Sequence, residues 1–157
     1  MIPLNPALDL ELNRLLAATP AQVWRCWTEP ALLIQWFAPK PVITREAVIE
    51  PRPGGRFFTV MVLPDGTEMP GEGCILDAQP NRRLIFTDTL EAGFRPAAAP
   101  SLGFTAVITL TAEGAGTRYV ARALHRDAAT RTSHAEMGFH DGWGAATTQL
   151  DALARTL

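Results

Sequence analysis

The N-terminal part of the chain changes from a strand pattern to a helix pattern. In the segment 8–17, leucines alternate at first with polar residues, which is typical of a half-buried strand. Thr19 and Pro20 then suit the cap and the first position of a helix, and Gln22 completes a capping box. A second short helix is expected to start at Pro30 and to end at the next two prolines, because proline cannot continue the hydrogen-bond ladder.

The middle of the chain has the pattern of successive strands. Asp65 and Gly66 form a strong tight-turn dipeptide, and the segment 113–116 is expected to form a second hairpin turn. The segment 91–100 is rich in Ala, Pro and Gly, and it is expected to be a loop. The predicted strands are 42–50, 56–63, 67–77, 83–90, 103–111 and 117–124.

The last part of the chain has a helical period. Apolar residues recur at alternating steps of four and three, which predicts one amphipathic helix over 137–156. Such a helix would be about 30 Å long, enough to cross the concave face of an antiparallel sheet. The predicted fold class is therefore α+β, with two short helices after the first strand and one long helix at the end. The residues of the apolar stripe are Phe139, Trp143, Ala146, Leu150, Leu153 and Leu157.

The composition narrows the kinds of partner. The 157 residues are 47% hydrophobic, which suits the core of one domain spanning 1–157. A formal net charge of −2 gives no bulk attraction to nucleic acid or to anionic membranes. No apolar run approaches the ~20 residues of a membrane span, and the N-terminus does not resemble a signal peptide. Because Cys26 and Cys74 lie in apolar segments, we expect buried free thiols in a cytoplasmic protein.

Several short motifs occur in one order along nearly the whole chain. Together they resemble the activator of Hsp90 ATPase homologue-like family, within the START/Bet v 1-like (SRPBCC) superfamily. The motifs are TPAQVW at 19–24, WTEP at 27–30, WFAP at 36–39, RPGG at 52–55, PDG at 64–66, PNRRLIF at 80–86 and GFHDGW at 138–143.

This resemblance implies a helix-grip fold, in which a curved antiparallel sheet wraps around a long C-terminal helix and leaves a cavity between them. Members of the superfamily bind lipids, sterols, polyketides and other hydrophobic molecules, and some are cyclases or aromatic-ring hydroxylating subunits. The eukaryotic activators that give the family its name act as co-chaperones and carry an additional N-terminal domain. Fold alone does not establish function, which has to be argued from the site.

Candidate reactive groups are few and poorly spaced. Glu136 and His140 would share a helix face, but His134 and His140 form a poor helical pair, so no metal site is predicted. Glu136 and His140 are then hydrogen-bonding residues at a pocket rim or ordinary polar residues. Neither Ser101 nor Ser133 lies in a nucleophile elbow, and the sequence lacks a nucleotide-binding glycine motif. No catalytic residue and no cofactor is assigned.

Aromatic residues are concentrated on elements that are expected to face one another. Gly138, Gly142 and Gly144 cost helix stability, and they favour a close approach to the sheet, a bend, or room for a ligand. We therefore predict a ligand-accessible cavity at the start of the long helix, with Trp36 and Phe37 near its mouth. The predicted ligand-binding residues are Trp36, Phe37, Phe58, Phe86, Phe104, Phe139, His140 and Trp143.

The leading hypothesis is a binding domain, rather than an enzyme, for a small hydrophobic or amphipathic ligand. The first alternative is a co-chaperone-like protein-interaction domain, which an extended exposed patch away from the cavity would favour. The second alternative is a cyclase-type enzyme acting inside the cavity. Convergent polar groups with perturbed pKa values deep in the pocket would favour that alternative.

Overall fold

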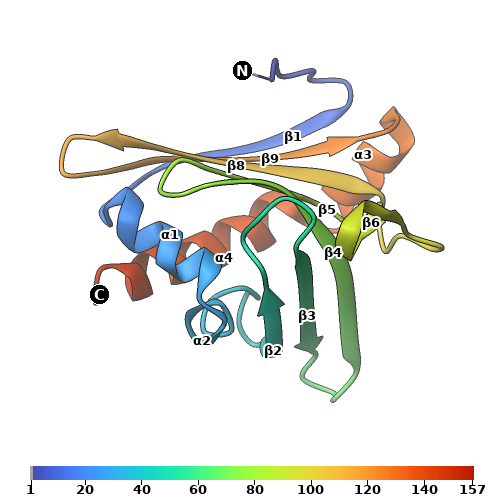
Figure 1. The fold of residues 1–157 in the computed structure, drawn as a ribbon, viewed down its shortest axis with the longest axis horizontal. Coiled ribbons are helices and arrows are strands. Elements are labelled where there is room, and N and C mark those ends of the chain that lie inside the picture. Colours follow the sequence, from blue (N-terminus) through green and yellow to red (C-terminus); the bar gives the residue numbers. More distant parts are fainter. Residues whose placement is uncertain (1) are drawn as a thin grey trace.

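The computed structural model describes residues 2–157 as an α+β helix-grip fold, in which a curved antiparallel sheet wraps around a C-terminal helix (Figure 1). Seven strands form the sheet in the order β1-β9-β8-β5-β4-β3-β2. The strands are β1 (Asp9–Leu16), β2 (Ile43–Ile49), β3 (Arg56–Val62), β4 (Glu68–Gln79), β5 (Arg83–Thr87), β8 (Phe104–Glu113) and β9 (Gly116–His125).

The helices occur as two pairs. The helices α1 (Pro20–Thr28) and α2 (Pro30–Leu33) follow β1, while α3 (Ala128–Glu136) and α4 (Phe139–Ala154) follow β9. Helix α4 lies on the inner side of the curved sheet and packs against α1 and β1 (Figure 1). None of the helices within residues 2–157 combines the length and the apolar character that a membrane crossing requires.

The predicted start of α1 is confirmed. Thr19 Oγ1 accepts a hydrogen bond from the Gln22 backbone N–H at 3.2 Å, and Gln22 Oε1 accepts one from the Thr19 N–H at 2.9 Å. Helix α2 is shorter than expected, because it ends at Leu33. The chain continues in an irregular turn in which the Phe37 N–H still donates to the Leu33 carbonyl at 3.1 Å.

The sheet tolerates a proline in β4 because half of that strand lies at an edge. Pro70 pairs with Val60 of β3, whereas β5 joins the other side of β4 only from Cys74 onward. The edge position therefore leaves no ladder hydrogen bond for Pro70 to break. The turn before β4 is the predicted one, with Gly66 at a φ of 90°, a conformation that glycine adopts without strain.

The expected single helix over 137–156 is wrong at its start. Helix α4 begins at Phe139, and Gly138 before it has a φ of 91°, which ends the preceding helical path. The separate helix α3 was not predicted, because its sequence has no apolar stripe. Its start is capped instead by Asp127, whose side chain accepts a hydrogen bond from the Thr130 N–H at 2.8 Å.

The segment 91–100 was expected to be a loop, but it contains a small hairpin. Strands β6 (Leu90–Glu91) and β7 (Arg95–Pro96) flank the single turn η1 (Ala92–Phe94). The Gly93 N–H donates to the Gly54 carbonyl at 2.8 Å and so ties the hairpin to the connection between β2 and β3.

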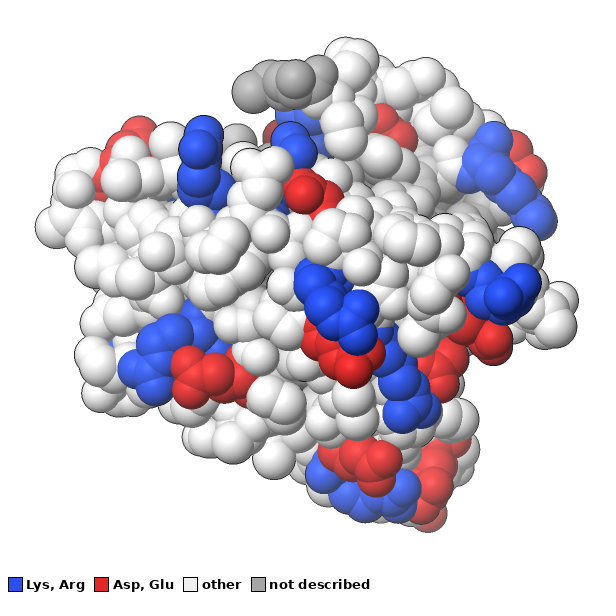
Figure 2. All heavy atoms as spheres, in the orientation of Figure 1, with Lys and Arg blue, Asp and Glu red and all other residues white. Residues whose placement is uncertain are grey.

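Charged side chains of both signs are interspersed on the face of the molecule shown in Figure 2, where basic side chains lie close to carboxylates. Among the ion pairs, Arg56 and Glu72 are joined at 2.8 Å and Arg83 and Asp77 at 2.7 Å. In the interior, Cys26 and Cys74 are buried free thiols, as predicted.

Candidate functional site

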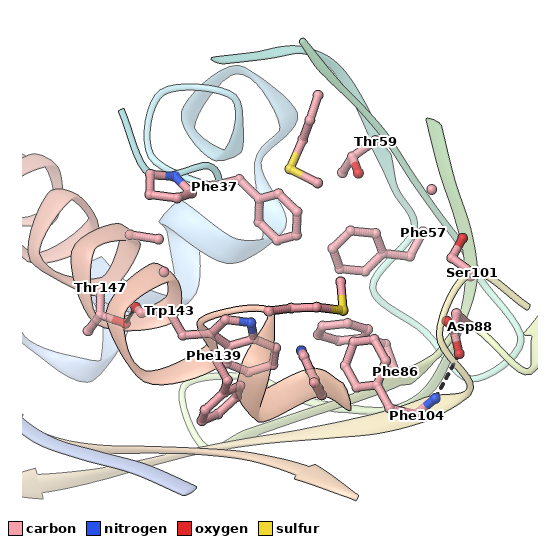
Figure 3. Close-up of a pocket in the computed structure, with 18 of the residues that line it drawn as sticks. Phe37, Phe57, Thr59, Phe86, Asp88, Ser101, Phe104, Phe139, Trp143 and Thr147 are labelled. Atoms are coloured by element: carbon pink, nitrogen blue, oxygen red, sulfur yellow. Dashed lines mark hydrogen bonds between the residues drawn. The ribbon is translucent and has the colours of Figure 1, made fainter. Parts of the chain in front are cut away.

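An aromatic cavity of about 360 Å³ lies between the concave face of the sheet, α4 and the turn after α2 (Figure 3). The aromatic rings in its wall pack closely on one another. The Trp27 and Trp36 ring centroids are 4.9 Å apart, and those of Phe57 and Phe86 are 4.6 Å apart. On α4, the ring centroids of Phe139 and Trp143 are 4.5 Å apart. The cavity is therefore a mostly apolar space, partly open to solvent, with closely packed aromatic rings in its wall.

Strand alternation decides which residues of β3 face the cavity. Phe57, Thr59 and Met61 are two residues apart and line it, because successive side chains of a strand point to opposite faces. Phe58 therefore lies on the other face, where the Arg56 guanidinium stacks at 4.4 Å from its ring. Phe58, which was predicted as a ligand-binding residue, thus lies outside this cavity.

The first two turns of α4 form the opposite wall. Phe139, Gly142, Trp143 and Ala146 recur at helical spacing and all line the cavity. No heavy atom lies within 4 Å of a Cβ built on Gly142, so this glycine leaves part of the cavity empty.

The other two glycines of this region have different roles. Gly138 provides the positive φ at the break before α4. A Cβ on Gly144 would meet the Arg14 guanidinium at 3.0 Å, so Gly144 lets Arg14 of β1 approach the helix. Of the three roles expected for these glycines, Gly138 thus provides the break, Gly144 the close approach and Gly142 the open space.

Six of the eight predicted ligand-binding residues meet at the cavity, namely Trp36, Phe37, Phe86, Phe104, Phe139 and Trp143. Trp36 is a buried wall residue rather than a mouth residue, because it is 3% exposed and its indole N–H donates to the Cys26 carbonyl at 2.9 Å. His140 is exposed outside the cavity, with Nε2 3.2 Å from the Glu11 carbonyl. His140, which was also predicted as a ligand-binding residue, therefore does not join the other six at the cavity.

The structure adds lining residues that the sequence did not single out. Trp27 and Tyr119 lie at the inner side, where the indole N–H donates to the Tyr119 hydroxyl at 3.3 Å. Thr147 also lines this side, and its hydroxyl donates to the Trp143 carbonyl at 2.7 Å. These residues add a few polar atoms to a mostly apolar wall.

Two histidines form a buried pair at one end of the cavity. His125 Nε2 and His134 Nδ1 are 2.9 Å apart, and His134 also lines the cavity. Burial first, and the neighbouring His125 second, lower the pKa of His134 to about 4, against an opposing effect of Asp88. His134 is therefore a neutral imidazole at physiological pH.

Asp88 is the carboxylate nearest to this end of the cavity wall, and it is occupied by backbone groups (Figure 3). Its two oxygens accept hydrogen bonds from the N–H groups of Leu102, Gly103 and Phe104 at 2.7–3.1 Å. Asp88 thus holds the loop before β8 in place, and its charge is balanced by these donors.

No group of three or more His, Cys, Asp or Glu side chains suited to a metal ion occurs within residues 2–157. Glu136 and His140, the two side chains that the sequence suggested for one helix face, are both exposed.

Comparisons with known proteins agree with this architecture. The sequence profile of the family described as Activator of Hsp90 ATPase homolog 1-like protein matches residues 17–155. A crystal structure of a protein from Nitrosomonas europaea is 44% identical, with 98% of this chain and 97% of that chain covered and a TM-score of 0.93. A comparison with curated proteins found no match.

Two further crystal structures are similar to the chain. A protein from Rhodobacter sphaeroides is 26% identical over 100% of this chain and 99% of that one, with a TM-score of 0.85. A protein from Mycobacterium smegmatis is 26% identical over 96% of this chain and 92% of that one, with a TM-score of 0.79.

Proposed function

This chain belongs to the Activator of Hsp90 ATPase homolog 1-like family, and from that premise we propose that it binds a small hydrophobic or amphipathic ligand in the cavity between the sheet and α4. The observation that carries the proposal is the aromatic cavity of about 360 Å³. This volume lies in the range of common ligand sites, roughly 300–1,000 Å³, which are mostly apolar with a few polar groups. Transfer of an apolar ligand from water into such a space is favourable by roughly 25 cal/mol per Å² of buried apolar surface.

The polar groups of the cavity support recognition rather than acid–base catalysis. A general base works best when its pKa lies near the operating pH. His134, with a pKa of about 4, is a weak base at neutral pH. Burial raises the pKa of Tyr119 well above its usual value, so its hydroxyl is a weak acid. The cyclase-type alternative therefore has polar groups in the cavity but not the proton-transfer strength that it requires.

Gly142 offers a direct test, because a larger side chain there would occupy part of the cavity, and its Cβ would meet no heavy atom within 4 Å. Gly142 has helical backbone geometry, so Gly142→Leu also improves helix propensity. We expect this variant to stay folded and to lose at least tenfold in affinity for the neutral lipophilic probe N-phenyl-1-naphthylamine. Probe fluorescence and quenching of the cavity tryptophans measure the binding.

Ala145→Leu is the matched control, since Ala145 is an exposed position on the same helix. It adds the same side chain outside the cavity and should leave probe affinity within about twofold of the wild type. Equal loss in both variants, or no effect of Gly142→Leu on a probe that binds, would show that the probe sits elsewhere. Failure of the wild-type protein to bind the probe would overturn the ligand proposal and leave the protein-interaction alternative.

A cytoplasmic location is part of this proposal. It is supported by the two free thiols, Cys26 and Cys74, since proteins of reducing compartments keep their cysteines unpaired.

A further inference from the structure

The buried histidine pair has a hydrogen-bonding order that can be deduced from its partners. His125 Nδ1 lies 2.7 Å from the Leu8 carbonyl oxygen. A carbonyl oxygen only accepts hydrogen bonds, so Nδ1 of His125 carries a proton, which is the single proton of the ring in its neutral form. Nε2 of the same ring is then a bare nitrogen that accepts.

The second histidine follows from the first. Because His125 Nε2 accepts, the bond of 2.9 Å to His134 requires a proton on His134 Nδ1. A neutral imidazole has one N–H, so Nε2 of His134 is left bare. The Leu8 carbonyl thus determines, through the His125 and His134 rings, that His134 Nε2 is an acceptor.

His134 Nε2 faces the cavity. The two nitrogens of an imidazole point in nearly opposite directions, so a ring that donates to His125 on the sheet directs Nε2 away from it. The His134 ring packs against three cavity aromatics, with centroid distances of 5.2 Å to Phe104, 5.3 Å to Phe139 and 5.9 Å to Trp143. His134 is 7% exposed, and within residues 2–157 no group hydrogen-bonds to its Nε2.

We propose that His134 Nε2 is the polar anchor of the cavity and that it selects a neutral ligand with a hydroxyl donor, an alcohol or phenol, on an apolar body. This inference rests on the proposed function. His134 Nε2 is accessible from the cavity, so a ligand that displaces water from it has to replace the lost hydrogen bond; a ligand O–H does so, whereas an ether or a hydrocarbon does not. An anionic headgroup is disfavoured, because a bare nitrogen offers it no proton and the Asp88 carboxylate also lines the cavity.

Three ligands of nearly the same shape test the selection: 4-hexylphenol donates a hydrogen bond, 4-hexylanisole only accepts, and hexylbenzene does neither. Titration calorimetry of the wild-type protein should give about tenfold tighter binding of the phenol than of the anisole or the hydrocarbon, the ratio that one good hydrogen bond supports. His134→Phe should reduce this preference to within about twofold while hexylbenzene still binds. His134→Gln, which retains an acceptor, should keep part of it.

His140→Phe is the matched control, because it removes an exposed histidine outside the cavity and should leave the preference unchanged. Equal binding of the three ligands to the wild-type protein would overturn the anchor and leave the proposed function standing. Failure of all three to bind would overturn both. A preference that survives His134→Phe would also overturn the anchor.

A second measurement needs no variant. Two-bond ¹H–¹⁵N correlation spectra distinguish protonated from bare imidazole nitrogens. At neutral pH we expect His125 and His134 both to carry the proton on Nδ1, with His134 Nε2 bare and shifted when 4-hexylphenol binds. A proton on His134 Nε2 at neutral pH would refute the deduced order.

Discussion

At the residue scale, a single buried contact determines the chemistry of the cavity. His125 closes the end of β9 against the chain before β1, and its ring presents an acceptor to His134 of α3. The low pKa of His134 is the energetic consequence, because a charged ring at this position would lose its hydration. A neutral ring is therefore both the stable form and the form that could accept a hydrogen bond from the proposed ligand.

The His134 pair makes stability depend on pH in a defined window. The unfolded His134 binds a proton near pH 6.5, while the folded one binds it near pH 4, so the unfolded state holds more protons between these values. Stability should be highest above pH 6.5 and fall by up to about 3 kcal/mol as the pH drops to 4. His125 and Asp88 are the titratable groups that modulate this change.

Urea unfolding of the wild type and of His134→Gln from pH 7.5 to 4.5 measures the effect. In the variant, the free energy of unfolding should no longer fall with the titration of His134, but it should still change with the titration of the carboxylates. Parallel curves for the two proteins would contradict the prediction.

At the element scale, α4 combines a cavity wall with a core anchor. Its first two turns carry Gly142 and Trp143 at the cavity, whereas its last turns carry Leu150 and Ala154, both 0% exposed, against β1 and α1. The Asp151 carboxylate adds a polar attachment by accepting the N–H groups of Ala17 and Ala18 at 3.2 and 3.0 Å. The tightly held C-terminal half lets the other half border an empty space.

Truncation along α4 should therefore have unequal costs. Leu150→Ala should lower the free energy of unfolding by about 2–5 kcal/mol, because it opens a cavity in a fully buried site. Leu153→Ala should cost clearly less, since Leu153 is only half-buried, although its place in the apolar stripe alone suggests a core residue. Urea unfolding of both variants decides the order, and equal losses would count against this account of the helix.

At the scale of the whole molecule, the curved sheet encloses more space than its own side chains fill. The strands β2, β3 and β4 turn away from β1, β8 and β9, and α4 lies between them together with α1 and α2 (Figure 1). The space that remains is the cavity, so the proposed ligand binding would be linked to global stability.

A bound ligand should raise the melting temperature by mass action. At 100 times its dissociation constant, 4-hexylphenol should stabilise the protein by about 2.7 kcal/mol. For a chain of 157 residues this corresponds to a rise of roughly 5–10 °C. Gly142→Leu, with its cavity filled, should show little or no rise in the same thermal scan. A similar rise in the variant would place the ligand outside the cavity.

Features that depend on neighbouring residues could be predicted from the sequence. The capping box of Thr19 and Gln22, the turn at Gly66 and the aromatic start of α4 each need only groups within one or two turns of chain. The family motifs then supplied the overall topology. Six aromatic residues of the cavity could be predicted from these patterns, because the fold places their elements around the space between the sheet and α4.

Features that depend on distant residues were decided by the tertiary structure alone. The face taken by Phe58 follows from the register of β3 against β2 and β4, and a shift by one residue would reverse it. The break before α4 is a local feature, the left-handed Gly138, but a periodic pattern does not reveal it. The cavity acceptor on His134 depends on His125 and on the Leu8 carbonyl, which lies 117 residues from His125 in the chain. Sequence thus determined the local elements, while long-range contacts, which no local pattern encodes, decided the chemistry of the site.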